Sequence, residues 1–314
     1  MVVSAARTIG LVVHPARPVE TSVATIVRWA GEHEVAVLVG EDDYGRLGQP
    51  AGVRPVPRGV LATTADALLS LGGDGTMLGA MRLVAASPVP VLGVNHGHRG
   101  FLIEVAPAHL DAALQAILEG RYELEPHSCL RVSGTSPGLA FNDLVLARRG
   151  RGAAVQVDLM VNDDRYGYYR CDAVIVSTPT GSTAYNYAAG GPVVSPSAAV
   201  VTVTPVAPIS GISRSVVLGA DDAVRLELPA GVPAVELELD GVPRGTLEPE
   251  RGVDVELVAE GGLVVRLDAR RHAERNRVKL SLTDLPLRQD QLLDLVPREL
   301  RDRGVLGRSS GDLH

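Results

Sequence analysis

The stretch Gly72-Gly73-Asp74-Gly75-Thr76 combines a carboxylate with three glycines at the end of an apolar run. Residues 67–71 are apolar except for Ser70, as in a strand buried on both faces, and apolar side chains then recur at helical spacing. The glycines would permit a left-handed backbone and the close approach of a ligand. Amides in such a turn, with the N-terminus of the following helix, bind anions. The stretch therefore predicts a phosphate site between a strand and a helix.

The carboxylate of Asp74 would repel a phosphate ligand unless it has a chemical task. It could accept the proton of an attacking hydroxyl group, or hold a magnesium ion that bridges phosphates. The alternative is a turn residue that caps the helix, since short glycine motifs often occur without function. The other polar stretches of the chain have to decide between these roles.

A second polar loop, Asn95-His96-Gly97-His98-Arg99-Gly100-Phe101-Leu102, follows the next predicted strand. It lies at the carboxyl edge of that strand, where open α/β sheets bind their ligands. Arg99 is a candidate for a ligand phosphate, because a guanidinium pairs well with phosphate oxygens. His96 and His98 are predicted to be solvated loop residues, since the nearby carboxylates that a metal site needs are missing.

Five hydroxyl side chains stand within seven positions from Ser177 to Thr183, in a run that ends with Ala184 and Tyr185. A strand pattern precedes this run, and a helix-like segment follows it up to Gly190. Hydroxyls, amides and a helix start predict a second polar pocket, suited to phosphate or ribose. The alternative is a serine/threonine turn that caps the helix, although five hydroxyls exceed what capping uses.

Composition excludes several classes of protein. The 314 residues, 46% of them apolar, predict two domains, and no segment approaches the roughly 18 uncharged apolar residues of a membrane helix. The N-terminus lacks a signal-peptide pattern, and two cysteines make neither a disulfide framework nor a zinc site, so we expect a cytoplasmic protein. The net charge of −7 gives no general attraction for nucleic acid or acidic membranes. Lys279 is the only lysine, which excludes a Walker phosphate loop.

The first 120 residues alternate between strand and helix patterns, which predicts a parallel sheet with helices on its faces. The predicted strands are 8–14, 35–39, 66–71 and 89–94, and the predicted helices are 19–33, 74–86 and 107–120. Residues 45–59, rich in Gly, Pro and Arg, are predicted to form a loop.

From Arg121 the apolar spacing changes to alternation, and short strands separated by turn residues follow. This predicts an antiparallel sandwich or barrel-like second domain that begins near residue 121. The predicted strands are 122–132, 139–147, 155–161, 166–170, 173–177, 200–206, 214–218, 223–228, 235–239, 252–257 and 263–267.

These motifs, together with Phe141-Asn142-Asp143, occur in the order and spacing of the NAD kinases, which the chain resembles over most of residues 8–280. The resemblance implies a Rossmann-like α/β domain over 1–120, a β-sandwich domain over 121–280, and NAD bound between them in a homo-oligomer, a dimer or a tetramer. It also implies transfer of the γ-phosphoryl group of ATP to the 2′-hydroxyl of the adenosine ribose of NAD, with Mg2+ or another divalent cation accompanying ATP. Nucleic acid and membranes are not expected as partners.

The resemblance implies roles for individual positions. Asp74 would activate the ribose hydroxyl, Asn142 and Asp143 would contact the dinucleotide, and Tyr185 would pack on a base or ring. Arg170 and Asp172 would reach the ligand from a neighbouring subunit. The other nucleotide-binding positions are Gly73, Gly75, Thr76, Asn95, Arg99, Phe101, Thr180, Ser182, Thr183, Ala184 and Asp240.

Three residues depart from the family pattern on the acceptor side: Arg99 replaces a leucine, Ala173 a glycine and Ile209 a histidine. They leave open a kinase of the same fold with another acceptor, such as a nucleoside, a nucleotide or a lipid hydroxyl. A non-catalytic sensor of NAD or NADP is the other alternative, although a sensor gains nothing from Asp74. The residues are compatible with ATP, another triphosphate or polyphosphate as donor, and with NAD or NADH as acceptor. The tail 281–314 has its own leucine pattern, for which an added helix, an oligomer contact or packing on the N-terminal domain are alternatives.

Overall fold

The computed structural model describes residues 7–97, 102–150 and 152–268 of the chain. Residues up to Leu267 belong to one compact unit. The tail at 281–314 lies outside the described residues, as do Arg99 and Phe101 of the predicted site. Within the described ranges, no helix is both long enough and apolar enough to cross a membrane.

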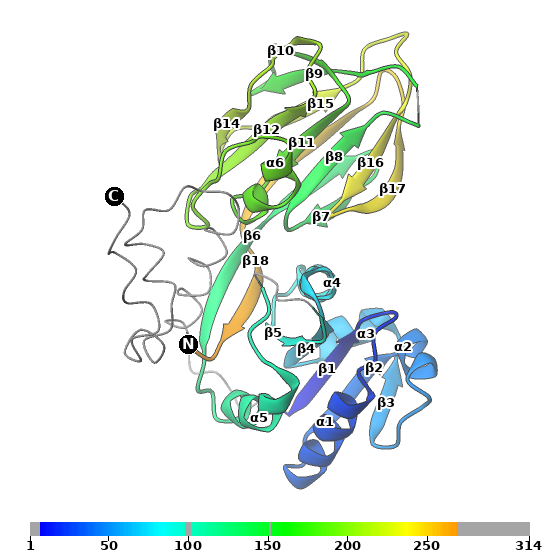
Figure 1. Ribbon diagram of the computed structural model, residues 1–314, viewed down its shortest axis with the longest axis vertical. Coiled ribbons are helices and arrows are strands. Elements are labelled where there is room, and N and C mark those ends of the chain that lie inside the picture. The colour runs from blue at the N-terminus through cyan, green and yellow to red at the C-terminus, as the bar shows by residue number, and fades with distance from the viewer. Residues whose placement is uncertain (1–6, 98–101, 151, 269–314) are drawn as a thin grey trace, which may run out of the picture. The chain divides into compact units, whose positions relative to one another are not determined.

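The N-terminal half is an α/β domain whose parallel strands have the order β3-β2-β1-β4-β5 (Figure 1). The strands are β1 (Thr8–Val13), β2 (Ala36–Gly40), β3 (Val53–Val56), β4 (Ala67–Gly72) and β5 (Pro90–Asn95). The helices are α1 (Glu20–Glu32), α2 (Glu41–Arg46), α3 (Arg58–Thr64), α4 (Asp74–Val84), η1 (Pro107–His109) and α5 (Leu110–Leu118). This order reverses direction between β1 and β4, which is where open α/β sheets bind their ligands.

Strand β4 carries the glycine-rich turn at its end, and all of its residues are buried. Leu69 and Leu71 face the cluster that includes residues of α1 and α5, whereas Leu68 faces the cluster that includes Met77 and Met81 of α4. Helices therefore cover both faces of the strand, as its continuous apolar sequence predicts. The turn that follows is anchored to the best-packed strand of the domain.

The prediction of a loop over 45–59 is wrong, because β3 and the start of α3 lie within this stretch. Strand β3 pairs with β2 at the edge of the sheet, where proline is tolerated because one side of the strand has no partner strand. Val53 and Val56 are buried, but Arg54 and Pro55 between them are exposed. Two separated valines give too little apolar signal to reveal a strand.

The C-terminal half is a sandwich of antiparallel strands, which confirms the predicted fold class. One sheet has the order β14-β12-β11-β8-β16-β17, and the other layer comprises β13-β10-β9-β15-β18 with β6 and β7. The core between them takes Leu146 and Val176 from the first sheet and Val157 and Val255 from the second. The elements are β6 (Glu123–Gly134), β7 (Gly138–Ala140), β8 (Asp143–Ala147), β9 (Val155–Val161), β10 (Asp164–Cys171), β11 (Ala173–Ser177), η2 (Thr180–Thr183), α6 (Tyr185–Ala188), β12 (Val200–Val206), β13 (Ser210–Gly211), β14 (Val216–Gly219), β15 (Val224–Glu227), β16 (Val235–Leu239), β17 (Val242–Leu247) and β18 (Gly252–Arg266).

One strand, β18, joins the parallel strands of the α/β domain and one layer of the sandwich into a 12-stranded sheet. Its first part pairs with β15, and its last part pairs in parallel with β5 through Leu263 and Val264. Strand β6 lies beside β18 along its whole length, with a register shift between Val258 and Gly262 (Figure 1). The prediction of two separate strands at 252–257 and 263–267 is therefore wrong, because the intervening residues form an irregularity within one strand.

Two further details of the β half differ from prediction. Strands β13 and β17 were not predicted, and the predicted strand 139–147 is divided into β7 and β8 at Phe141 and Asn142. The buried carboxylate of Asp240 binds the backbone amides at the break between β7 and β8 and accounts for the division. The division places Asn142 and Asp143 at a turn.

Candidate active site

The turn after β4 is open to a ligand, but not in the way that its glycines predict. Gly73 is the N-cap of α4, in an extended conformation, and Asp74 is the first helical residue. The expectation of a left-handed backbone is wrong, because none of the three glycines has a positive φ. A Cβ at Gly72 would lie 2.2 Å from Oγ1 of Thr76, whereas nothing lies within 4 Å of a Cβ at Gly73 or Gly75. Gly72 is required by packing, and the other two leave the backbone accessible.

A hollow of about 590 Å³ opens beside this turn. Gly73, Asp74, Gly75 and Thr76 line one side of it, and residues that follow β1 line the other. The hollow therefore lies at the point where the sheet reverses direction, between the carboxyl ends of β1 and β4. Its size and position suit the phosphates of a nucleotide.

Two arginines, Arg17 and Arg58, line the same hollow, and sequence reasoning missed both. Arg17 donates from its guanidinium to the carbonyl of His96 at 2.6 Å. The amide groups of Ala16 and Arg17 donate to Nδ1 of His14 at 3.0 Å, which fixes the start of this segment. Burial, and then the charges of Arg17 and Arg46, lower the pKa of His14, which favours the neutral ring that can accept these bonds. The position of Arg17 could have been predicted, because it lies in the polar segment directly after β1, at the same edge of the sheet as the glycine-rich turn.

The loop after β5 lies next to the turn, as predicted. Asn95 pairs with Gly72 in the β4–β5 register, and its side-chain oxygen accepts a hydrogen bond from the amide of Gly97 at 3.0 Å. The amide of His96 donates to the carbonyl of Gly72 at 2.9 Å. Burial lowers the pKa of His96. In the ranges that the structure describes, no three His, Cys, Asp or Glu side chains gather as a metal-binding group.

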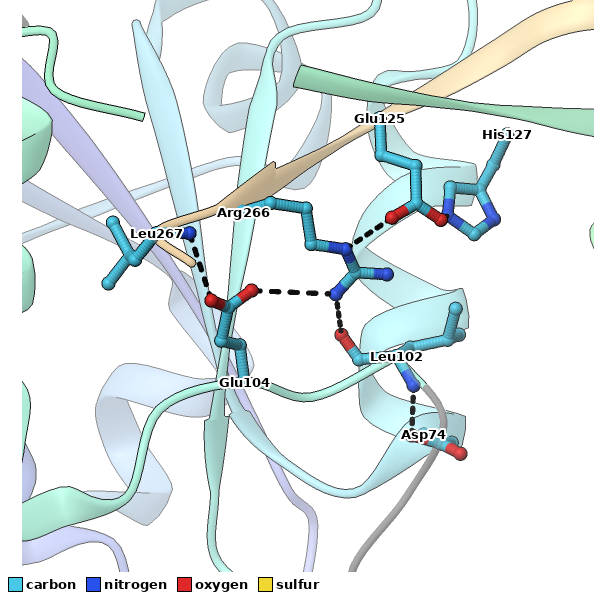
Figure 2. Close-up of polar contacts among 7 residues, drawn as sticks. All are labelled: Asp74, Leu102, Glu104, Glu125, His127, Arg266 and Leu267. Atoms are coloured by element: carbon cyan, nitrogen blue, oxygen red, sulfur yellow. Dashed lines mark hydrogen bonds and ion pairs between the residues drawn. The ribbon is translucent and has the colours of Figure 1, made fainter. Parts of the chain in front are cut away.

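The carboxylate of Asp74 is oriented by the chain that returns from this loop. Its Oδ1 accepts a hydrogen bond from the amide of Leu102 at 3.1 Å (Figure 2). Gly73, which has no side chain, occupies the N-cap position that the capping alternative would give to an acidic residue. Asp74 thus lies at the N-terminus of α4, on the wall of the hollow, and the amide of Leu102 holds its carboxylate.

The turn that carries Asn142 and Asp143 is organised by Asp240. The Asp240 carboxylate accepts hydrogen bonds from the amides of Phe141, Asn142 and Asp143 at 3.1, 2.7 and 3.2 Å. Its fourth partner is Arg82 of α4, at 2.5 Å, and the Asp240 side chain is 0% exposed. Asp240 was predicted to bind the nucleotide, but its carboxylate faces the backbone of the turn and Arg82. Its carboxylate holds the turn in place, and its contact with a nucleotide stays a prediction.

The hydroxyl run after β11 is largely bonded within the protein. Thr178 donates to the carbonyl of Phe141 at 2.7 Å and accepts from the amide of Gly181, while Ser182 donates to Pro179 and accepts from Val194. A Cβ at Gly181 would lie 2.0 Å from the carbonyl oxygen of Asn142, so glycine is needed for this close approach. The run therefore packs directly on the Asn142 turn.

Four predicted residues at or after this run, and Asn142 of the neighbouring turn, are more accessible. Thr180, Thr183 and Ala184 are half-buried, and Tyr185 is exposed. The Thr183 hydroxyl donates to the carbonyl of Thr180 at 3.3 Å, a contact within η2. Asn142 is half-buried. Neither η2 nor α6 has a side-chain cap, so helix capping does not account for the run, and the exposed face beside it stays available to a ligand.

The carboxyl group of Asp143 is buried and has a raised pKa. Burial, and then the charges of Asp240 and Glu238, raise its pKa to about 7, against the opposing effect of a hydrogen bond from the backbone of Tyr185. A carboxyl group with this pKa can donate or accept a hydrogen bond near neutral pH. It is therefore suited to bind a ribose hydroxyl.

The positions near the β-sandwich edge have different surroundings. Arg170 is exposed, and Asp172 lies 3.3 Å from Nε of Arg148 in an exposed ion pair. Ala173 is buried in a small apolar cluster with Val145 and Ile175, so its methyl group has packing partners within the chain. Ile209 is 61% exposed.

The fold and the site define a class of protein: a nucleotide-binding α/β domain of the Rossmann-like kind, joined to a β-sandwich. Family models of the ATP-NAD kinase N-terminal and C-terminal domains match residues 9–122 and 141–261. An NAD kinase of Symbiobacterium thermophilum is 39% identical over 254 residues, which cover 79% of this chain and 89% of that protein. The chain belongs to the NAD kinase family, which confirms the resemblance seen in its motifs.

Two solved structures share the fold. Yeast NADH kinase complexed with NADH has a TM-score of 0.81 at 23% sequence identity, and covers 90% of this chain and 89% of its own. An NAD kinase from Archaeoglobus fulgidus in complex with ATP has a TM-score of 0.68 at 23% identity, and covers 88% of this chain and 99% of its own.

The environment of Asp240 predicts a strong effect of its substitution on stability. Asp240→Asn removes the charge that balances the partly buried Arg82 and that accepts from three amides, so it should lower the free energy of unfolding by about 3 kcal/mol. Asp254→Asn is the matched control, since Asp254 pairs with Arg225 at 2.9 Å on the surface, and it should cost about 1 kcal/mol or less. Urea denaturation of both variants measures the difference. Equal effects would show that the buried pair has no special role.

The raised pKa of Asp143 predicts a dependence of stability on pH. Between about pH 4 and pH 7 the folded protein keeps a proton on Asp143 that the unfolded chain releases. The contribution of Asp143 to the free energy of unfolding therefore falls as the pH rises through that range. Asp143→Asn carries no such charge and should lose less stability than the wild type between pH 5 and 8. Each pKa unit corresponds to about 1.4 kcal/mol, so the two curves should separate measurably in urea denaturation. Parallel curves would contradict the prediction.

Proposed function

We propose that the protein transfers the γ-phosphoryl group of ATP to the 2′-hydroxyl of the adenosine ribose of NAD. Membership of the NAD kinase family makes it a phosphotransferase of this class. The observation that carries the proposal is the position of Asp74, a carboxylate on the wall of a hollow that two arginines and the accessible glycine-rich turn also line. A protein that only binds a nucleotide gains nothing from this charge.

The donor phosphates would lie in the hollow. The accessible backbone at Gly73 and Gly75, the N-terminus of α4, and the guanidinium groups of Arg17 and Arg58 supply the opposing partial and full positive charges. Thr76 adds a hydroxyl group on the same wall. Holding the phosphates in one orientation and balancing their charge accounts for most of the catalysis in phosphoryl transfer.

Asp74 would accept the proton of the attacking hydroxyl. A ribose hydroxyl ionises far above neutral pH, so the proton moves to the carboxylate late in a loose transition state and not before it. The hydrogen bond from the Leu102 amide fixes the orientation of the carboxylate for this task. Asp74 therefore orients the hydroxyl first and takes its proton afterwards.

The residues fit a divalent cation that arrives with ATP. No group of three potential ligands occurs among the described residues, and magnesium is commonly held by one or two carboxylates together with substrate phosphates. The donor phosphates would supply most of its ligands, because Asp74, the carboxylate that lines the hollow, is assigned to the hydroxyl proton. When bound, magnesium would supply positive charge that neutralises part of the charge of the donor phosphates.

The dinucleotide would be bound by the turn at Asn142 and Asp143 and by the exposed face that includes Thr180, Thr183 and Tyr185. This assignment is supported by the close packing of the hydroxyl run on the Asn142 turn. Asn95, Arg99 and Phe101 would contribute from the loop after β5. Arg170 and Asp172 would complete the site of a neighbouring subunit in a homo-oligomer, for which their exposure is the supporting observation.

The proposal keeps a domain boundary near residue 121, supported by the extents of the two family matches and by the start of β6 at Glu123. It also keeps a cytoplasmic location, supported by two buried cysteines that form no disulfide. A kinase of the same fold with a different acceptor is not favoured by the NAD kinase relatives.

An assay of acceptors tests the proposed reaction. Purified protein with ATP and magnesium is offered NAD, NADH, adenosine nucleotides and free nucleosides, and the position of the new phosphate is determined by NMR. NAD or NADH should be phosphorylated at the 2′-hydroxyl with a higher kcat/KM than the other acceptors. A better acceptor among the nucleotides or nucleosides would overturn the proposal.

A substitution of the carboxylate tests the role of Asp74. Asp74→Asn should lower kcat by about two to four orders of magnitude and change the affinity for NAD much less, because it removes a proton acceptor and leaves the binding surface. Asp254→Asn, on the surface of the β-sandwich, is the control and should keep wild-type kcat. Near-normal turnover of Asp74→Asn would exclude Asp74 from the mechanism.

A further inference from the structure

Arg266, near the end of β18, is a buried arginine behind the candidate active site. Its side chain is 2% exposed, and its guanidinium donates to the carbonyl of Leu102 at 3.0 Å and to Glu125 at 2.5 Å (Figure 2). The same guanidinium lies 3.8 Å from Oε2 of Glu104. A buried arginine with two carboxylates and a backbone carbonyl is costly to place unless its geometry is well satisfied.

The carboxylates around Arg266 are themselves held in place. Glu104 accepts a hydrogen bond from the amide of Leu267 at 2.9 Å, and Glu125 lies 2.9 Å from Nε2 of His127. Burial acts to raise the pKa of Glu125, but hydrogen bonds from His127 and Arg266 outweigh it and hold that pKa below its ordinary value. Glu125 is therefore an anion beside Arg266, and the guanidinium has a fixed position.

Leu102 connects this cluster to Asp74. Its carbonyl accepts the hydrogen bond from Arg266, and its amide donates to Oδ1 of Asp74 (Figure 2). The next residues along the chain are tied to the sheet, since the amide of Val105 donates to the carbonyl of Gly93 at 3.1 Å. Both polar backbone groups of Leu102 are thus engaged, one by the guanidinium and the other by the candidate proton acceptor.

We propose that Arg266 is a positioning residue for phosphoryl transfer, which holds Leu102 and through it the carboxylate of Asp74. Arg266 is not among the residues that line the hollow, so it acts through Leu102 and not on the ligand. The planar guanidinium binds Glu125 through Nε and Leu102 through Nη1, and the rotatable donors of a lysine ammonium do not reproduce this fixed spacing. The proposal rests on the proposed role of Asp74 as proton acceptor.

The test compares Arg266→Lys with the wild type in steady-state kinetics. The variant keeps the charge but loses the two-directional geometry, so kcat should fall about 10- to 100-fold, as expected for a misplaced catalytic group. KM for ATP and for NAD should change less than about threefold, because Arg266 lies outside the hollow. Arg225→Lys is the matched control, since Arg225 makes a comparable bond to Asp254 on the surface, and its kcat should equal that of the wild type.

A double variant separates positioning from general loss of structure. In an Asp74→Asn background, Arg266→Lys should reduce the residual kcat by less than about threefold, because the group on which it acts is already gone. Glu125→Gln provides a milder change in the same cluster and should lower kcat about three- to tenfold if Arg266 is displaced. Far-UV circular dichroism and urea denaturation give the folded fraction to which each kcat is normalised.

Each outcome decides the proposal. A normal kcat for both Arg266→Lys and Glu125→Gln, alongside an inactive Asp74→Asn, overturns the role of Arg266 and leaves that of Asp74 intact. An undiminished effect of Arg266→Lys in the Asp74→Asn background also overturns it, because Arg266 would then act independently. If Asp74→Asn itself keeps normal turnover, the proposed mechanism and the role of Arg266 both fail. If the Arg266→Lys variant does not fold, the kcat of Glu125→Gln decides the proposal, and a normal value overturns it.

Discussion

Both parts of the candidate site, the Asn142 turn and the helix α4, depend on the hydrogen bonds and the ion pair of the buried Asp240 carboxylate. This carboxylate binds the amides of Phe141, Asn142 and Asp143 and the guanidinium of Arg82. Three amides and one cation satisfy a charge that would be costly to bury alone. Because Arg82 belongs to α4, the helix that begins at Asp74, one carboxylate ties the turn of the β-sandwich to the helix of the phosphate site.

The electrostatics of the site are local. The chain carries a net charge of −7 and a single lysine, so the attraction for an anionic nucleotide cannot come from its overall charge. Arg17 and Arg58, the accessible turn and the start of α4 gather positive potential at one sheet edge. The charge of Arg266 is balanced by Glu104 and Glu125, so it does not attract the nucleotide and instead holds the backbone of Leu102. Arginines of one chain thus serve two different purposes, set by their burial.

Much of the fold and part of the site follow from local sequence. The apolar run 67–71, the glycine-rich turn and the helical spacing after it specify β4, its turn and α4 with few alternatives. The short edge strand β3 and the helix α2 were missed, because two buried valines or a single amphipathic turn give no clear period. Asp240 was named as a ligand contact, although its partners are more than 90 residues away along the chain. No sequence pattern reveals which way such a side chain faces.

The sequence by itself determined most of the longer elements, the class of chemistry and the family, because period, turn residues and the Asp74 and hydroxyl motifs are local properties. The tertiary structure alone decided that Arg17 and Arg58 share one hollow with Asp74, that β18 joins the two halves, and that Arg266 reaches Leu102 from 164 residues away. These contacts depend on strand order and register. Register is set by the packing of the whole sheet and not by any single segment, since a slip of one residue would turn every side chain of a strand to the other face.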